Sequence, residues 1–378
     1  MSIQRECRSV AYSICRQYMQ TKIVRILKCL VFCSLLLLAL VGLNLVLKPV
    51  PNPYNPWHAY QELEEGSIDV LVIGNSHAYT AFAPMQLWKS AGITSWVLGA
   101  GATNTQHKVT ILEEGLRTQQ PQLILFELWM PDDVETQRPE VANALYAHFP
   151  FGANKARGVL RDSPPEDFWN NFLPLIQNAD RYADINRRSF DFLLMEGNEY
   201  RKVTGGATPL ASLSARAADI QFPPFEIPVE IGFDMRGEFE QLKRVVRLAE
   251  KSDAQLVFFF APVASDRAIS VIEEIRFELY DVPKLADVKL VDMNDFAADL
   301  NLSFDDFFDP EHLQLWGMRR ATAWIETEII IPLLEGDRSY SQKTIDWWDV
   351  QAAHWKQITE GIYAIQGEEI DYWQGLEL

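Results

Sequence analysis

The stretch Ile68–His77, with the sequence IDVLVIGNSH, decides how the rest of the chain is interpreted. Its first part is a short apolar run rich in Ile and Val that ends at Gly74, a pattern typical of a buried parallel strand. Asn75, Ser76 and His77 follow in a turn, and a helical pattern begins soon afterwards. We therefore expect Ser76 to lie just beyond a strand tip, where open α/β sheets bind their ligands.

The same alternation of strand and helix patterns continues along the chain. Four more apolar runs predict strands at Ser95–Gly101, Gln122–Leu128, Ala254–Pro262 and Val288–Met293. Helical patterns lie between or after them, at Pro84–Ser90, Asn104–Thr118, Glu238–Ser252, Asp266–Leu279 and Leu315–Leu333. Such alternation predicts an α/β fold with three layers, α/β/α, in which helices cover both faces of a mainly parallel five-stranded sheet.

A membrane anchor is predicted near the N-terminus. Residues 29–47 contain 19 residues without a charge, flanked by Lys28 and Lys48, and about 20 such residues span a bilayer core as a helix. The positive-inside rule places the N-terminus in the cytoplasm and the main domain outside, periplasmic or extracellular. A cleaved signal peptide is the alternative, but its charged region and its apolar run would both be unusually long.

Charge and cysteine content narrow the classes of function. The chain of 378 residues has a net charge of −18; residues 1–28 carry six basic and one acidic side chain, so residues 29–378 carry −23. This balance argues against nucleic-acid binding. All four cysteines precede residue 34, so we expect neither disulfides nor a Cys/His metal site in the external part, and no cofactor.

The chain divides into five predicted segments. They are a cytoplasmic segment (1–28), a transmembrane anchor (29–47), a Pro-rich extended spacer (48–65), an α/β domain (66–335) and an acidic, Trp-rich tail (336–378). Within the domain, residues 131–235 lack regular alternation and read as an insertion, either shaping a substrate site or merely elaborating the structure. The tail's four tryptophans either form a docking surface or pack back on the domain, and packing is favoured.

Three side chains suggest nucleophilic catalysis. A serine hydroxyl becomes a nucleophile when a base removes its proton, and His312 is the only histidine with an aspartate three positions before it, Asp309. His312 would act as the base and Asp309 would orient it. Each part is a weak signal alone, since a serine in such a turn is commonly just a helix N-cap.

Taken together, the two motifs resemble the SGNH (GDSL-type) hydrolase superfamily. Gly74-Asn75-Ser76 is similar to its first block and Asp309-x-x-His312 to its fifth. The resemblance implies an SGNH-like domain with flavodoxin-like strand order and a Ser76–His312–Asp309 triad. It also implies an oxyanion hole that includes Ser76, with the N–H of Ser76 or His77 and of Gly99 or Gly101 as donors. The asparagine usual in the third block is absent, and Asn104 is our candidate to replace it.

The differences from the usual SGNH motifs fit one subgroup of this superfamily better. Membrane-anchored SGNH-like proteins of bacterial cell-surface polysaccharide modification share an N-terminal anchor, a degenerate third block and a D-x-x-H-L-x-x-x-G ending, which Asp309, His312, Leu313 and Gly317 reproduce. The resemblance implies a serine acyltransferase that moves an acyl group, such as acetyl, from a donor to an exported polysaccharide. It also implies a multi-span membrane acyltransferase as a partner. An esterase with the same triad and a non-catalytic scaffold are the alternatives.

Two further residues are candidates for substrate contact. His77 adjoins the proposed nucleophile, although a capping or packing role is favoured. Glu127 lies at a strand tip, where it would act on substrate or serve as a structural carboxylate, the role we favour. The chain contains neither a G-x-S-x-G elbow nor a P-loop, which argues against an ordinary α/β-hydrolase or a nucleotide triphosphatase.

Overall fold

A computed structural model describes residues 2–46, 57–129, 139–177, 204–208, 235–336 and 338–364. At its centre is a five-stranded sheet with the order β2-β1-β3-β4-β5, and every neighbouring pair is parallel. The strands are β1 (Val70–Gly74), β2 (Ser95–Gly99), β3 (Leu123–Glu127), β4 (Gln255–Phe260) and β5 (Lys289–Asp292). All five predicted strands are confirmed, and each lies within the range expected from its apolar run.

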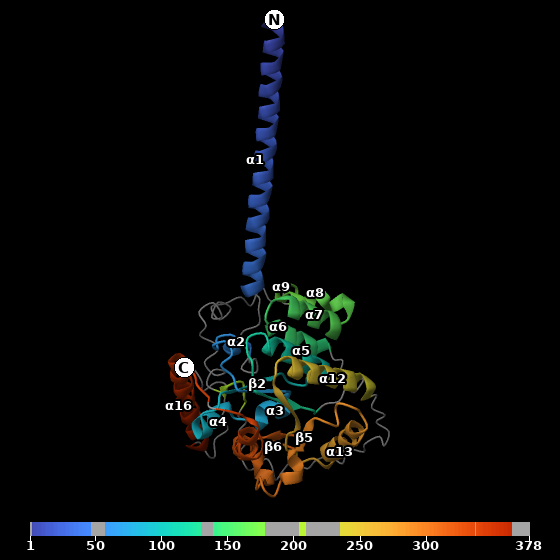
Figure 1. Cartoon of the computed structure of the whole chain (residues 1–378), viewed down its shortest axis with the longest axis vertical. Coiled ribbons are helices and arrows are strands. Elements are labelled where there is room, and N and C mark those ends of the chain that lie inside the picture. The colour runs from blue at the N-terminus through green and yellow to red at the C-terminus, as the bar shows by residue number, and fades with distance from the viewer. Residues whose placement is uncertain are drawn as a thin grey trace.

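Helices pack on both faces of this sheet because both faces are apolar. In β1, Leu71 and Ile73 belong to one core and Val70 and Val72 to the other. The first core includes α5 (Thr105–Gly115), α12 (Met235–Lys251) and α13 (Asp266–Tyr280), and the second includes α3 (Ser76–Ala81). Helix α14 (Leu315–Ile325) contributes Leu315 and Met318 to the first core and Ala321 and Ile325 to the second. Helix α4 (Pro84–Ala91) contributes to both cores. Figure 1 shows these helices around the sheet.

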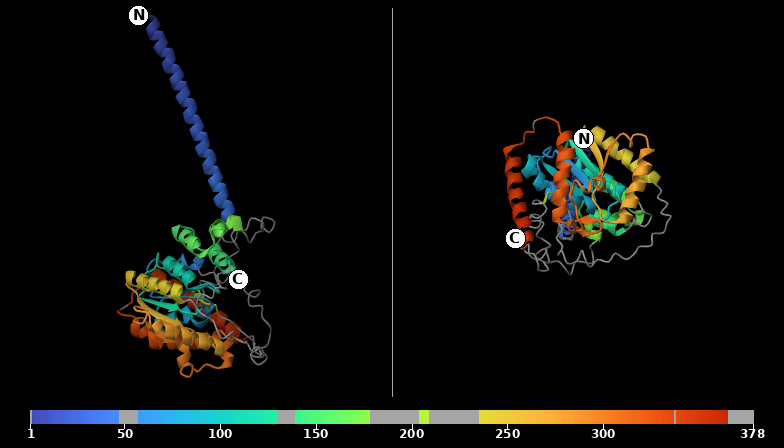
Figure 2. Two further views of the ribbon diagram at one scale, coloured as in Figure 1. Left: turned by 90° about the vertical axis from the view of Figure 1, so that its right-hand side faces the viewer. Right: turned by 90° about the horizontal axis from the view of Figure 1, so that it is seen from below.

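The N-terminal segment is one continuous helix, α1 (Ser2–Val46), which projects away from the domain (Figures 1 and 2). Within it, residues 22–44 are long and apolar enough to cross a membrane, and that window is not buried against the protein. The predicted apolar run at 29–47 lies largely within this window. Leu47, the last residue of that run, lies outside the described residues.

The globular part begins earlier than the predicted boundary at residue 66. Residues 57–60 form α2 (Trp57–Tyr60), and Trp57 and Tyr60 are buried in the core. The prediction of an extended spacer is therefore wrong for this part of 48–65, because the two aromatic side chains pack rather than extend. Residues 47–56 lie outside the described residues.

The predicted insertion contributes four helices among its described residues. It forms α6 (Pro139–His148), α7 (Ala153–Asp162), α8 (Phe168–Phe172) and α9 (Pro174–Gln177), with a short 3-10 turn, η2 (Pro165–Asp167), before α8. Leu145 and Tyr146 of α6, and Phe149 directly after it, are buried in the main core. Residues 204–208 lie along β2, where the carbonyl of Gly205 accepts a hydrogen bond from the Val97 N–H at 2.9 Å. Both described parts thus belong to the packed domain.

The C-terminal region also packs on the domain. The predicted helix at 315–333 is α14 followed by a π-helical turn, η7 (Glu326–Ile330), and α15 (Ile331–Leu333). Helix α16 (Gln342–Ala364) contributes Trp348 and Trp355, both buried, to the core, with Trp347 partly buried against it. These rings therefore serve packing, as the sequence favoured, while Trp373 lies outside the described residues.

Candidate active site

The turn after β1 holds Ser76 at the carboxyl edge of the sheet. Strand β1 ends at Gly74, Asn75 caps α3, and the Asn75 Oδ1 accepts a hydrogen bond from the His77 N–H at 3.0 Å. A Cβ on Gly74 would lie 2.3 Å from the Cβ of Ala78, so only glycine permits this tight strand-to-helix turn. Ser76 is the first residue of α3 and is half-buried.

Asp309 and His312 lie on a small hairpin that precedes α14. Its strands are β6 (Phe307–Asp309) and β7 (His312–Leu313), and Asp309 is the antiparallel partner of His312. Two more 3-10 turns, η5 (Met293–Phe296) and η6 (Phe304–Asp306), lead from β5 to this hairpin.

Leu313 and Gly317, the remaining residues of the D-x-x-H-L-x-x-x-G pattern, pack the hairpin against α14. Leu313 is 1% exposed, and a Cβ on Gly317 would lie 2.4 Å from the backbone oxygen of Asp306. The absence of a side chain at Gly317 therefore lets α14 approach the loop that carries the hairpin. These two positions therefore help to hold the hairpin that carries Asp309 and His312.

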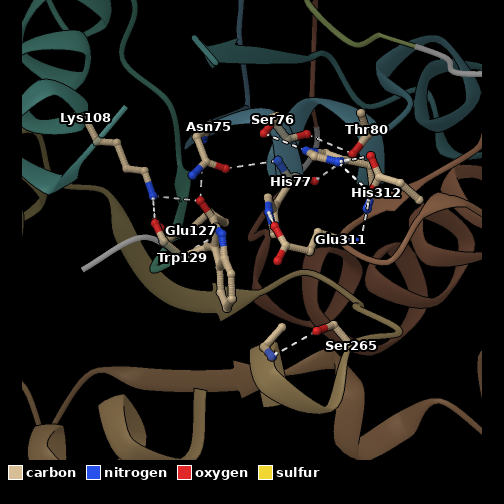
Figure 3. A network of polar contacts seen from close by, with 12 residues as sticks. Asn75, Ser76, His77, Thr80, Lys108, Glu127, Trp129, Ser265, Glu311 and His312 are labelled. Carbon is tan, nitrogen blue, oxygen red and sulfur yellow. Dashed lines mark hydrogen bonds and ion pairs between the residues drawn. The ribbon is translucent and has the colours of Figure 1, made fainter. Parts of the chain in front are cut away.

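The fold brings the three predicted side chains together. The His312 Nε2 lies 2.8 Å from the Ser76 Oγ, although the two residues are 236 positions apart. On the other side of the ring, the His312 Nδ1 lies 2.8 Å from each carboxylate oxygen of Asp309. Figure 3 shows Ser76 and His312 facing each other. This is the geometry of a serine nucleophile, its base and the group that orients the base.

The pKa of Asp309 indicates which nitrogen of the His312 ring carries a proton. Burial by itself raises the pKa of the Asp309 carboxyl, but hydrogen bonds from the His312 ring and from the backbone N–H groups of Glu311 and His312 outweigh it and hold the pKa below its usual range. The carboxylate is thus ionised at neutral pH and only accepts hydrogen bonds. The Nδ1 of His312 must then carry the ring proton, which leaves Nε2 free to accept the proton of the Ser76 hydroxyl.

His77 packs beside the three hydrogen-bonded side chains of Ser76, His312 and Asp309. It is 3% exposed, its ring stacks on Trp129 with centroids 4.7 Å apart, and its edge meets the ring of His312 at 5.0 Å. Burial lowers the pKa of His77 well below its ordinary value, and nearby His312 and Lys108 act in the same direction. The side chain is therefore neutral and largely shielded from solvent, which agrees with the packing role rather than with substrate contact.

Glu127, the other candidate for substrate contact, is fully buried. Its Oε2 lies 2.7 Å from the Nζ of Lys108, and its Oε1 accepts a hydrogen bond from the Trp129 N–H at 2.6 Å. Burial raises the pKa of Glu127, and the charge of Lys108 opposes the rise. Figure 3 shows this pair beside Asn75 and Trp129. These contacts join the end of β3 to α5.

The candidate oxyanion donors differ in their surroundings. The His77 N–H is already bonded to the Asn75 side chain, which leaves the Ser76 N–H as the candidate of that pair. Gly99 pairs with Gly74 across the sheet, and a Cβ there would lie 3.1 Å from the Gly74 oxygen.

Gly101 and Asn104 follow β2 in the same loop. Gly101 is exposed in the turn after the strand. Asn104 is buried and caps α5, where its Oδ1 accepts from the His107 N–H at 2.9 Å. The Asn104 side chain therefore has a structural role whatever else it does.

Lys108 and Trp129 are the functional neighbours that the sequence did not reveal. Lys108 is 0% exposed, and its Nζ donates to the backbone oxygens of Glu127 and Trp129 as well as to the Glu127 carboxylate. A lysine within a helical pattern is normally read as solvent-facing, so nothing in the pattern marked it.

Among the described residues, no three His, Cys, Asp or Glu side chains are grouped as metal ligands would be.

The hydroxyl, imidazole and carboxylate are therefore joined by hydrogen bonds at the edge of the sheet, in an arrangement suited to proton transfer. Geometry alone carries this identification. No protein-family model matches the chain, and a search of the curated proteins finds no similar sequence.

Proposed function

We propose that this chain is a membrane-anchored serine acyltransferase that works through an acyl-enzyme on Ser76. The single observation that carries the proposal is the 2.8 Å contact of the Ser76 Oγ with a His312 ring that Asp309 holds from its other side. Support for an SGNH-like, three-layer domain comes from the strand order, which matches the flavodoxin-like order, and from the place of Ser76 after β1.

The first half-reaction forms the acyl-enzyme. The Ser76 Oγ attacks the carbonyl carbon of an acyl donor while its proton passes to the Nε2 of His312. The tetrahedral intermediate collapses when the bond to the leaving group breaks, and His312 returns the proton to that group. Asp309 stabilises the imidazolium while it exists but does not itself take the proton.

The second half-reaction runs the same steps in reverse with a new nucleophile. A hydroxyl of the acceptor polysaccharide loses its proton to His312 and attacks the Ser76 ester, and Ser76 leaves with the returned proton. Water in place of the sugar would give hydrolysis. Ser76 is half-buried and the His312 side chain is 23% exposed, so water can reach both residues. An esterase is therefore the second candidate function.

The negative charge of both tetrahedral intermediates requires donors, each typically contributing about 10²–10³ in rate. We assign this role to the Ser76 N–H together with an N–H from Gly99 or Gly101, and keep Asn104 as the candidate side-chain donor. Gly99 supports the assignment because its missing side chain leaves the backbone of β2 close to the nucleophile turn.

Helix α1 supports a location of the reaction on the outer side of the membrane. Its apolar window and the +5 charge of residues 1–28 support a single span with a cytoplasmic N-terminus and an external domain. We therefore place the acceptor among exported or cell-surface polysaccharides. The acyl donor would reach the site through a multi-span membrane acyltransferase, which we propose as the partner.

The test is the covalent intermediate itself. The full chain in detergent or nanodiscs is treated with an activated acetyl ester, and peptides are examined by mass spectrometry. We expect an added acetyl group on Ser76, none in Ser76→Ala, and wild-type labelling in the control Ser270→Ala, which removes an exposed hydroxyl on α13. An unmodified Ser76 in the wild type, with the protein folded, would contradict the proposal and favour a non-catalytic scaffold.

Partitioning of the acetyl group separates transfer from hydrolysis. Release of acetate is measured with and without oligosaccharides from exported bacterial polysaccharides. A transferase is expected to divert acetyl groups to sugar as the oligosaccharide concentration rises, whereas constant acetate release with every acceptor would identify an esterase.

A further inference from the structure

The helices of the 131–235 region stand where α1 meets the domain. Figures 1 and 2 show α7, α8 and α9 around the C-terminal end of α1. Helices α1 and α9 are in contact, and the Leu175 N–H donates a hydrogen bond to the Asn44 Oδ1 at 3.0 Å. Asn44 is also the last residue of the apolar window. Helix α9 is therefore tied to α1 at the level where the apolar window ends.

A cluster of four aromatic rings consists of Phe168, Trp169 and Phe172 of α8 and Phe151, which lies just before α7. Phe151 and Phe172 have centroids 4.9 Å apart, Phe168 stacks on Phe172 at 5.4 Å, and Trp169 meets Phe168 edge-on at 5.1 Å. Phe168 packs against the main core and so fixes the cluster to the domain. Phe151 and Trp169 nevertheless remain 63% and 58% exposed. We call these four residues the aromatic cluster.

Two exposed aliphatic side chains lie on α7 and α9, the helices that pack against α8. Leu160 of α7 is 67% exposed and Ile176 of α9 is 42% exposed. Single exposed apolar residues are ordinary, but a contiguous group of them marks an interaction site. Here the group adjoins a helix end whose own apolar side chains are exposed along the window.

The chemistry of this surface fits lipid at the headgroup level. Tryptophan and other aromatic side chains are favoured at the membrane interface, where amphipathic and aromatic segments lie in its plane. Charge does not supply the attraction, because residues 29–378 carry −23 and bacterial and eukaryotic cell membranes contain anionic lipid. The exposed charges nearby, Arg157 on α7 and Glu166 before α8, oppose each other in sign. Apolar contact must therefore provide the binding.

We propose that the aromatic cluster, with Leu160 and Ile176, rests in the interfacial layer of the bilayer that α1 spans. The inference rests on the proposed spanning role of α1 and adds a second point of membrane contact. A single span leaves a domain free to rotate and tilt, whereas two points of contact fix which face it presents to the membrane. Ser76 would then meet membrane-delivered acyl donor from one direction.

Spin-label accessibility in the full chain tests this contact. The four native cysteines are replaced by alanine, and single cysteines are introduced by Leu160→Cys, Trp169→Cys, Leu36→Cys and Phe277→Cys. Leu36 lies in the apolar window of α1, and Phe277, 71% exposed on α13, is the matched control for Leu160. Each nitroxide-labelled protein is placed in nanodiscs of phosphatidylethanolamine with a minority of phosphatidylglycerol.

We expect the ratio of accessibility to oxygen over a water-soluble nickel chelate to be several-fold higher at 160 and 169 than at 277, approaching the value at 36. If position 36 is in lipid while 160 and 169 behave like 277, α1 spans the bilayer and the interfacial contact is wrong. If 160 and 169 are shielded from both reagents, a second copy or another protein covers them, and the inference is also wrong. If position 36 is aqueous, the proposed anchor fails with it.

A second variant guards against a label that disturbs its own site. Phe151→Ser combined with Trp169→Ser removes the two most exposed rings of the cluster, and Leu160→Cys reports on the neighbouring surface. The oxygen-to-nickel ratio at 160 is expected to fall toward that at 277 while the thermal unfolding midpoint stays near that of the parent. An unchanged ratio would show that the rings do not hold the domain at the bilayer.

Discussion

The Nζ of Lys108 lies 2.7 Å from the Oε2 of Glu127, and both side chains are completely buried. Lys108 also binds the backbone oxygens of Glu127 and Trp129, and the Asn75 N–H points at the Glu127 carboxylate at 3.5 Å. One buried pair thus joins α5 and the end of β3 to the turn that carries Ser76.

Removing one member of this pair should be costly. Lys108→Met leaves the buried Glu127 without its cation, so we expect a loss of about 3–5 kcal/mol in the free energy of unfolding. The double variant Lys108→Met, Glu127→Gln removes the unpaired charge and keeps one of the two side-chain acceptors for the backbone N–H groups, so it should recover about 1–3 kcal/mol of that loss. Urea unfolding of the parent, Lys108→Met, Glu127→Gln and the double variant measures these values and completes the double-mutant cycle. Strictly additive losses would show that the two side chains do not interact.

The turn before Ser76 should not tolerate a side chain at Gly74. Alanine there would place a Cβ 2.3 Å from the Cβ of Ala78 and 2.9 Å from that of Glu127, so we expect a loss of roughly 1–3 kcal/mol and slower acylation of Ser76. Gly237→Ala in α12 is the control, because a Cβ there meets nothing within 4 Å and alanine favours helix by up to about 1 kcal/mol. If Gly74→Ala unfolded and reacted like this control, the close packing would be wrong.

His77 should make the protein sensitive to acid. Its folded pKa lies well below 6.5, so the unfolded chain binds a proton that the folded protein does not, and stability falls as the pH falls below about 6.5. The slope for one such proton is at most about 1.4 kcal/mol per pH unit. His77→Phe keeps the ring on Trp129 and removes this term. Urea unfolding at pH 7.5 and pH 5 compares the two, and equal pH dependence in both would refute the assignment.

Substitutions in the proposed triad should act as a unit. Asp309→Asn leaves the hairpin in place but removes the ionised acceptor that orients the His312 ring, and a loss of about 10⁴ in the rate of acyl transfer is expected. Adding Asp309→Asn to His312→Gln should cost little more than His312→Gln alone, because the shared proton pathway is already broken. Single-turnover acylation rates provide the measurement. If the fold-losses of the two single variants multiply in the double variant, the two residues act separately.

The strands and helices could be read from the sequence because they depend on local patterns. Both faces of the parallel sheet are buried, so each strand is a continuous apolar run, and β1 and β4 stand out for this reason. The apolar window of α1 follows from composition alone. Local patterns also singled out Ser76, and Asp309 with His312, because their chemistry requires those residue types in that spacing.

Only the tertiary structure decided which of these residues meet. The 2.8 Å contact between Ser76 and His312 depends on two strand ends and a hairpin that the chain brings together over 236 positions. The burial of Lys108 likewise depends on Glu127, a partner from another element, and no pattern local to α5 encodes it. Local periodicity predicts whether a side chain is buried. It does not predict which residues that side chain contacts, because those contacts depend on packing between distant segments.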